Sequence, residues 1–160
     1  QNKVVTTPLG TKIVQVPKND IVLCSILRAG LPLHNGFLNY FDDAENAFIS
    51  AYRKHINETE FEIKVEYFAS PSLEGKTLIL TDPMLATGGS ASAAAKFLKD
   101  RGACEIFMAN LIASPEGVRK MGIDHPDVRI YTAALDRELN ENGYILPGLG
   151  DAGDRTFGTL

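Results

Sequence analysis

The chain has 160 residues, 44% of them hydrophobic, and a formal net charge of −4 at pH 7. This length fits one domain with a real core, and the acidic balance argues against a nucleic-acid-binding surface. The two cysteines, Cys24 and Cys104, form no CxxC pair, and the three histidines are scattered, which argues against a zinc site. No apolar run approaches the roughly 20 residues of a membrane-spanning helix, so we expect a cytoplasmic protein whose cysteines are reduced core residues.

The predicted elements alternate between strands and helices. In chain order, apolar runs and helical spacing predict a strand at 13–16, a strand at 21–26, a helix at 33–41, a strand at 47–52, an antiparallel hairpin arm at 61–68, a strand at 77–80, a helix at 90–101, a strand at 106–112, a helix at 115–121 and a strand at 128–132. The glycine-rich stretch 147–154 is predicted to form no regular element. This order indicates an α/β fold, a parallel sheet flanked by helices, in a single domain over residues 1–160.

The turn 81–90, with the sequence TDPMLATGGS, joins a buried strand to a helix and is typical of a phosphate site. Backbone N–H groups and the helix dipole attract anions at such a helix start. Gly88 and Gly89 lack the Cβ atoms that would block close approach, and Thr87 and Ser90 add hydroxyl donors. The turn has neither the lysine of a GxxxxGK[ST] loop nor the spacing of GxGxxG. On spacing alone, an ordinary N-cap turn remains the alternative.

Asp82 narrows the expected ligand. A carboxylate beside a phosphate site repels the ligand unless it meets hydroxyl groups or a cation. A phosphorylated sugar with vicinal hydroxyls would satisfy both the backbone amides and this carboxylate. The turn therefore favours a sugar phosphate.

Three motifs in order carry a resemblance that covers nearly the whole chain: SILRAG at 25–30, DPMLATGGS at 82–90 and YILPGLGDAGDR at 144–155. The strand and turn at 78–90 resemble the phosphoribosyl-pyrophosphate signature of type I phosphoribosyltransferases. The three motifs together are similar to those of uracil phosphoribosyltransferases. The superfamily signature has two adjacent acidic residues, and here the second is Pro83, which is itself typical of the uracil branch.

The resemblance implies transfer of ribose 5-phosphate from phosphoribosyl pyrophosphate to N1 of uracil, giving UMP and pyrophosphate. It assigns phosphoribosyl pyrophosphate to two arginines, the turn and one carboxylate of the C-terminal loop: Arg28, Arg53, Asp82, Pro83, Met84, Leu85, Ala86, Thr87, Gly88, Gly89, Ser90 and Asp151. The arginines would clamp the pyrophosphate, although a surface ion pair remains the alternative for Arg53. We expect Mg²⁺ to accompany the pyrophosphate, held mainly by substrate oxygens and water.

The resemblance also implies a C-terminal hood that reads uracil, largely through backbone groups, at Tyr144, Ile145, Gly150, Asp151 and Ala152. Asp151 and Arg28 are the candidate catalytic residues. Asp151 would stabilise the cationic ribose, while its use as a general base toward N1 stays open. The family resemblance further implies a homodimer or a higher homo-oligomer.

Two alternatives remain, a non-catalytic relative that binds uridine nucleotides and a generic α/β nucleotide-binding module. The uracil-loop motif disfavours the second. Members of the resembled family carry a longer N-terminal segment, and this sequence begins just ahead of TPLG at 7–10, so we expect that segment to be absent. The charged stretch 58–66 is a solvated loop, a flap that excludes water, or an arm that contacts a second subunit.

Overall fold

The structure is a computed structural model that describes residues 2–16, 20–55 and 61–159, with the side chains of 51–55 and 61–64 outside the description. Its centre is a seven-stranded sheet in the order β5-β4-β3-β6-β8-β7, with β9 beside β8. The strands are β3 (Ile21–Ile26), β4 (Glu45–His55), β5 (Phe61–Ala69), β6 (Thr77–Thr81), β7 (Met84–Leu85), β8 (Glu105–Ala113) and β9 (Arg129–Leu135). All pairings are parallel except that of β5 with β4, which confirms the predicted α/β fold.

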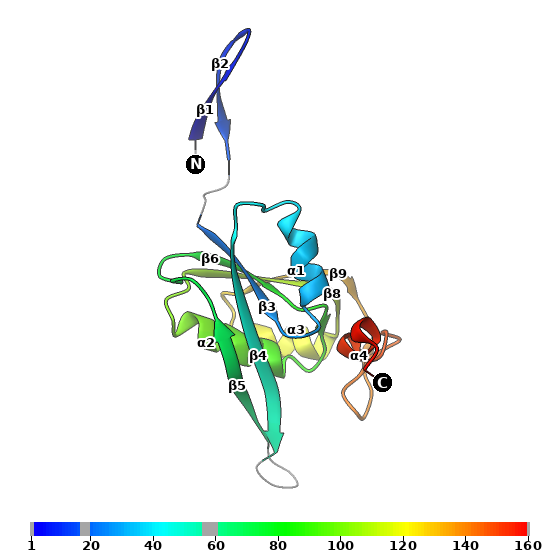
Figure 1. The fold of residues 1–160 in the computed structure, drawn as a ribbon. Helices are drawn as coiled ribbons and strands as arrows, with labels where there is room; N and C mark the ends of the chain where they lie inside the picture. Colours follow the sequence, from blue (N-terminus) through cyan, green and yellow to red (C-terminus); the bar gives the residue numbers. More distant parts are fainter. Residues whose placement is uncertain (1, 17–19, 56–60, 160) are drawn as a thin grey trace.

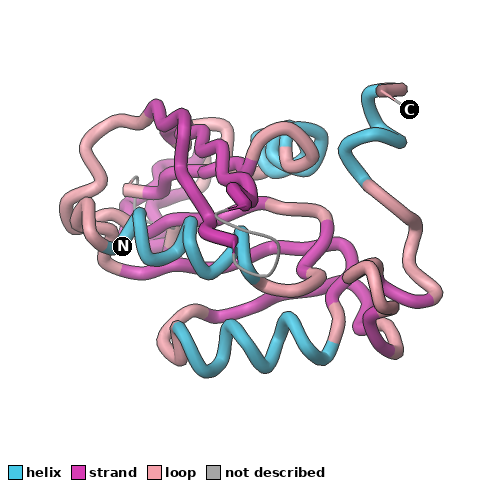
Figure 2. Tube along the Cα trace, turned by 90° about the horizontal axis from the view of Figure 1, so that it is seen from below, coloured by secondary structure: helices cyan, strands magenta, loops and turns pink. Residues whose placement is uncertain are grey.

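Helices cover both faces of this sheet (Figure 1). They are α1 (Leu31–Leu38), α2 (Gly89–Lys99), α3 (Pro115–Asp124) and, near the C-terminus, α4 (Ala152–Phe157). Figure 1 draws α1 on one side of the sheet and α2 and α3 on the other, and the view from below in Figure 2 shows helices running beside the strands. The result is a three-layer arrangement that brings the carboxyl ends of the parallel strands to one edge, where ligands bind in such folds.

The sheet has a hydrophobic core on each face, because successive side chains along β6 point to opposite faces. Leu78 and Leu80 are fully buried in the larger core, which α2 and α3 cover, whereas Ile79 belongs to a smaller core against α1. Helix α2 buries Ala94 and Leu98 at helical spacing, and small alanine side chains allow the helix to lie close to the sheet. Each large side chain buried in this way contributes about 1.5–3 kcal/mol.

The described residues include three antiparallel strand pairs, two of them outside the central sheet. Strands β1 (Asn2–Thr7) and β2 (Gly10–Gln15) pair with each other in a hairpin that Figure 1 draws apart from the sheet. The strand predicted at 13–16 is thus confirmed, but its partner β1 was not predicted. Strand β5 pairs antiparallel with β4, as expected for the arm. Near the C-terminus, β10 (Glu138–Leu139) pairs with β11 (Ile145–Leu146).

Two expectations are wrong. The stretch 147–154 is not irregular throughout, because Asp151 accepts the Asp154 N–H at 2.9 Å and caps α4, which begins at Ala152. Cys104 is exposed rather than part of the core, since it precedes β8 instead of lying in it, whereas Cys24 is buried and burial raises the pKa of its thiol to about 12. Both thiols are free. None of the helices in the described ranges is long and apolar enough to cross a bilayer.

Candidate active site

The turn between β6 and α2 forms a small cavity of about 80 Å³ at the edge where the parallel strands end. Gly88 is the N-cap of α2 and has a φ of +77°, a left-handed conformation that favours glycine. As a glycine it offers no capping side chain, and the Gly89 N–H donates to Thr87 Oγ1 at 3.5 Å. The cavity is lined by most of the residues expected to hold phosphate: Asp82, Met84, Leu85, Ala86, Thr87, Gly88, Gly89 and Ser90. Of the two adjacent glycines, only Gly88 uses a positive φ.

Pro83 is brought close to this cavity but does not line it. Its side chain is buried, and its carbonyl accepts hydrogen bonds from the backbone N–H groups of Leu111 and Ile112, each at 3.0 Å. Asn110 donates from Nδ2 to the Asp82 carbonyl at 2.6 Å. These hydrogen bonds fasten the turn to β8, and the Pro83 carbonyl is one of the groups that make the attachment.

Helix α3 supports the same turn from the side, through residues that the sequence prediction missed. Ser114 caps α3 and donates from Oγ to the Ala86 carbonyl at 2.7 Å. A Cβ atom on Gly117 would lie only 2.4 Å from the same carbonyl oxygen, so the approach of α3 requires glycine there. The sequence Ser114-Pro115 is a recognisable helix start, but nothing local indicates which turn it contacts.

Asp82 lies at the base of the cavity with part of its side chain exposed. Burial raises the pKa of its carboxyl from 3.8 to about 7, the Met84 N–H lowers that pKa, and the negative charge of Asp151 raises it. The C-terminal segment also lies against the turn, since a Cβ atom on Gly143 would be 3.2 Å from Thr87 Cγ2. The two site regions predicted from separate motifs are thus adjacent in the fold.

The loop after β3 places Arg28 beside α4. Arg28 Nη2 lies 3.4 Å from Asp154 Oδ1, and its guanidinium lies 5.7 Å from the centroid of the Phe157 ring. A Cβ atom on Gly30 would meet Ser25 Oγ and the Thr81 carbonyl, each at 2.5 Å, so this loop packs directly under β6. The Leu27–Arg28 peptide bond is cis. The side chain of Arg53, in β4, lies outside the described residues.

The C-terminal loop forms a second cavity of about 400 Å³, lined by Tyr144, Gly150, Asp151, Asp154 and Arg155. Ile145 and Ala152, also expected to contact the base, are buried, so only their backbone groups could face a ligand. Asp136, which the sequence prediction missed, accepts the Gly148 N–H at 3.0 Å through Oδ2 and holds the loop to the end of β8. Asp154 pairs with Arg28 rather than with its neighbour Arg155.

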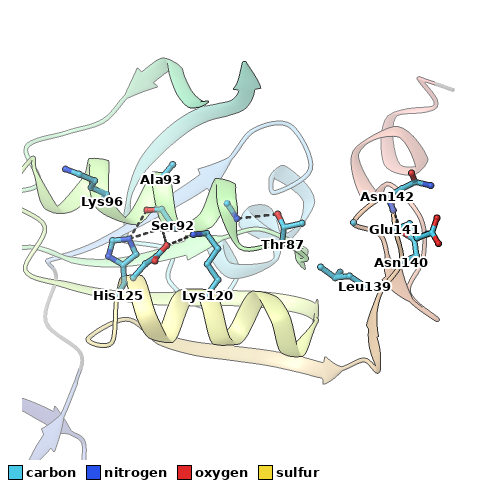
Figure 3. Close-up of a pocket in the computed structure, with 13 residues that line it drawn as sticks. Thr87, Ser92, Ala93, Lys96, Lys120, His125, Leu139, Asn140, Glu141 and Asn142 are labelled. Carbon is cyan, nitrogen blue, oxygen red and sulfur yellow. Dashed lines mark hydrogen bonds and ion pairs between the residues drawn. The ribbon is translucent and has the colours of Figure 1, made fainter. Parts of the chain in front are cut away.

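A third and larger cavity, of about 890 Å³, lies on the outer side of the turn between β6 and α2, bounded by α2, α3 and the turn of the C-terminal hairpin (Figure 3). On its wall, His125 Nε2 donates to the Ser92 carbonyl at 2.9 Å, and Nδ1 accepts from Lys99 at 3.3 Å. The Ser92 hydroxyl donates to Asp124 at 2.6 Å. These contacts tie α2 to α3 and are not the arrangement of a Ser-His-Asp triad, in which the histidine accepts the serine proton.

A family model described as "Uracil phosphoribosyltransferase" matches residues 1–159. The chain belongs to the uracil phosphoribosyltransferase family. It is 50% identical over 160 residues to a uracil phosphoribosyltransferase of Porphyromonas gingivalis, an alignment that covers 99% of this chain and 74% of that protein. This confirms the family suggested by the three motifs.

Solved structures agree with this membership. The AQ2163 protein of Aquifex aeolicus superposes with a TM-score of 0.88 and 35% identity, covering 98% of this chain and 74% of the other. A purine phosphoribosyltransferase of Pyrococcus horikoshii superposes with a TM-score of 0.59 over 74% of this chain and 72% of the other. At 18% identity, that second likeness shows the shared phosphoribosyltransferase fold alone.

Proposed function

We propose that this chain is a uracil phosphoribosyltransferase, a pentosyltransferase that makes UMP and pyrophosphate from uracil and phosphoribosyl pyrophosphate in pyrimidine salvage. The observation that carries the proposal is the closeness of the phosphate turn at 81–90 to the C-terminal segment, where a Cβ atom on Gly143 would lie 3.2 Å from Thr87 Cγ2. One region suits a sugar phosphate and the other suits a planar base. A ribose between them would join the two.

The 5′-phosphate binds the backbone N–H groups and hydroxyls from Ala86 to Ser90, where the helix dipole adds partial positive charge. Asp82 accepts hydrogen bonds from the ribose hydroxyls. Because its pKa is raised to about 7, a ligand that donates to the carboxylate stabilises the ionised form. The turn therefore fixes the anomeric carbon at a set distance from the base loop.

Arg28 faces the leaving pyrophosphate, with Arg53 as the second clamp residue. A guanidinium forks to two oxygens and stays charged, so it stabilises the negative charge that develops on pyrophosphate as the C–O bond breaks. The Arg28 side chain is 56% exposed and leans on Asp154, so it is free to exchange this ion pair for a ligand. Asp154 thus orients the clamp before substrate arrives.

Mg²⁺ accompanies the pyrophosphate. We expect the ion to be carried mainly by substrate oxygens and water. When bound, Mg²⁺ neutralises charge on the pyrophosphate. Asp82 and Asp151 carry the carboxylates of the site, which are the type of protein ligand that Mg²⁺ prefers.

The base loop presents uracil to the anomeric carbon. Backbone N–H and C=O groups of Ile145, Gly150 and Ala152 read the carbonyl and N–H edge of the pyrimidine, and Tyr144 lies against the ring or ribose. N1 bonds to the anomeric carbon, the bond to pyrophosphate breaks with its electron pair, and the N1 proton is released. Asp151, held by its bond to the Asp154 N–H, stabilises the positive charge on the ribose.

The chain assembles as a homodimer or a higher homo-oligomer in the cytoplasm. Val4, Leu9 and Ile13 are exposed on the β1–β2 hairpin, and a second copy would cover them. The two free cysteines fit a reducing compartment. Analytical ultracentrifugation tests the assembly, and a purely monomeric chain at micromolar concentration would contradict it.

The activity is tested by incubating the chain with phosphoribosyl pyrophosphate, Mg²⁺ and radiolabelled uracil. We expect labelled UMP together with an equal amount of pyrophosphate. UMP binding without product would instead favour a non-catalytic relative. If the chain makes no labelled UMP and also fails to bind UMP, the proposal is refuted.

A further inference from the structure

Glu116, in the first turn of α3, connects two parts of the molecule that are distant in sequence. Its Oε1 accepts the backbone N–H of Leu139 in β10 at 3.3 Å. Its own backbone N–H lowers the pKa of the carboxyl, burial opposes this, and the Leu139 N–H lowers the pKa further. The carboxylate is therefore ionised near neutral pH, and its position is held by the backbone N–H of Leu139.

On one side, Glu116 belongs to the part of α3 that is fastened to the phosphate turn. Its neighbours Ser114 and Gly117 both contact the Ala86 carbonyl, one through a hydrogen bond of 2.7 Å and the other through close backbone packing. Glu116 therefore lies in the part of α3 that is packed against the turn.

On the other side, Leu139 belongs to the hairpin that leads into the base loop. Leu139 pairs with Ile145 across the hairpin, and the loop of Gly150 and Asp151 follows. The turn of the hairpin also approaches the phosphate site, since a Cβ atom on Gly143 would lie 3.2 Å from Thr87 Cγ2. Figure 3 shows Thr87 and Leu139 facing each other along the wall of the large cavity.

We infer that Glu116 is a positioning residue that holds the base-binding hairpin in register with the phosphate turn. It contacts no substrate in the proposed complex. It acts by fixing the separation between the site that holds ribose 5-phosphate and the loop that presents uracil. This role rests on the proposed function, because register between the two regions matters only if one substrate spans them.

Two substitutions separate this tie from the simpler effect of a negative charge at the start of α3. Glu116→Gln keeps the length and an acceptor oxygen for the Leu139 N–H but removes the charge. Glu116→Asp keeps the charge near the helix start but withdraws the carboxylate by one methylene from Leu139. Glu138→Ala is the matched control. Glu138 lies beside Leu139 in β10, and its carboxylate pairs with the adjacent Arg137 at 2.9 Å rather than with the Leu139 N–H.

The test combines steady-state kinetics with amide hydrogen exchange. For Glu116→Asp we expect KM for uracil to rise about tenfold, KM for phosphoribosyl pyrophosphate to change by less than about twofold, and exchange at Leu139 to accelerate about tenfold. We expect Glu116→Gln and Glu138→Ala to resemble the unmodified chain in all three measurements.

Two results would overturn the inference. One is a loss in Glu116→Gln as large as that in Glu116→Asp or larger, which would assign the effect to charge on the helix. The other is unchanged exchange at Leu139 in Glu116→Asp. If the unmodified chain makes no UMP, the proposed function fails, and the exchange measurement still decides whether Glu116 ties the hairpin.

Discussion

The raised pKa of Asp82 makes a quantitative prediction about stability. In the folded chain its carboxyl titrates at about 7, whereas the ordinary value is 3.8. Between these two values the unfolded chain has lost a proton that the folded chain retains, so the free energy of unfolding falls as the pH rises from about 4 to about 7, and levels off above. Three pH units correspond to at most about 4 kcal/mol.

Asp82→Asn removes this pH dependence while keeping an acceptor oxygen for the Met84 N–H, which now lies 3.4 Å from Oδ1. Because Asp82 retains some exposure to solvent, we expect the variant to be more stable by about 2 kcal/mol at about pH 8 and nearly unchanged at about pH 4. Urea unfolding across this pH range measures the difference directly. Asp42→Asn, which removes an exposed carboxylate from the loop before β4, is the matched control.

The same substitution should abolish activity, because the amide cannot replace a carboxylate that accepts from two ribose hydroxyls. The reasoning is refuted if Asp82→Asn and the unmodified chain lose stability in parallel between about pH 4 and about pH 8. It is also refuted if the variant gains no stability at the upper end of the range.

Three further predictions concern the turn and the loop. Gly88→Ala should lower phosphoribosyl pyrophosphate affinity and cost about 1–2 kcal/mol of stability, because alanine is strained at a φ of +77°. Calorimetric titration measures the affinity and thermal unfolding measures the stability. Unchanged affinity and unchanged stability would contradict this prediction. Gly117→Ala should cost about 1–3 kcal/mol and weaken substrate binding, since its Cβ would press the Ala86 carbonyl; an unaltered melting temperature would disprove the close packing. Asp151→Asn should lower kcat more than it weakens UMP binding, and equal losses in both would mark Asp151 as a uniform binding group.

Much of the site could be predicted because its parts are local in sequence. The turn from Asp82 to Ser90 combines strand, glycines and helix within one segment, and the structure places nearly all of it around one cavity. Strand and helix order followed from periodicity in the same way.

The supporting residues could not be predicted, because their partners are distant in sequence. Ser114, Glu116 and Asp136 contact residues that are 28, 23 and 12 positions away. A serine before proline or a carboxylate in a first helical turn indicates a helix start and does not name the loop it holds. The exposure of Cys104 was missed for a related reason, since an apolar run does not fix where its strand begins.

The central claim is that backbone amides of the turn hold a sugar phosphate while the C-terminal loop holds the pyrimidine. A crystal structure of the chain with UMP tests it most directly. We predict the phosphate within hydrogen-bond distance of the N–H groups from Ala86 to Ser90 and the pyrimidine edge against the backbone near Gly150 and Ala152. UMP bound away from either segment, for example in the large cavity between α2 and α3, would contradict the account.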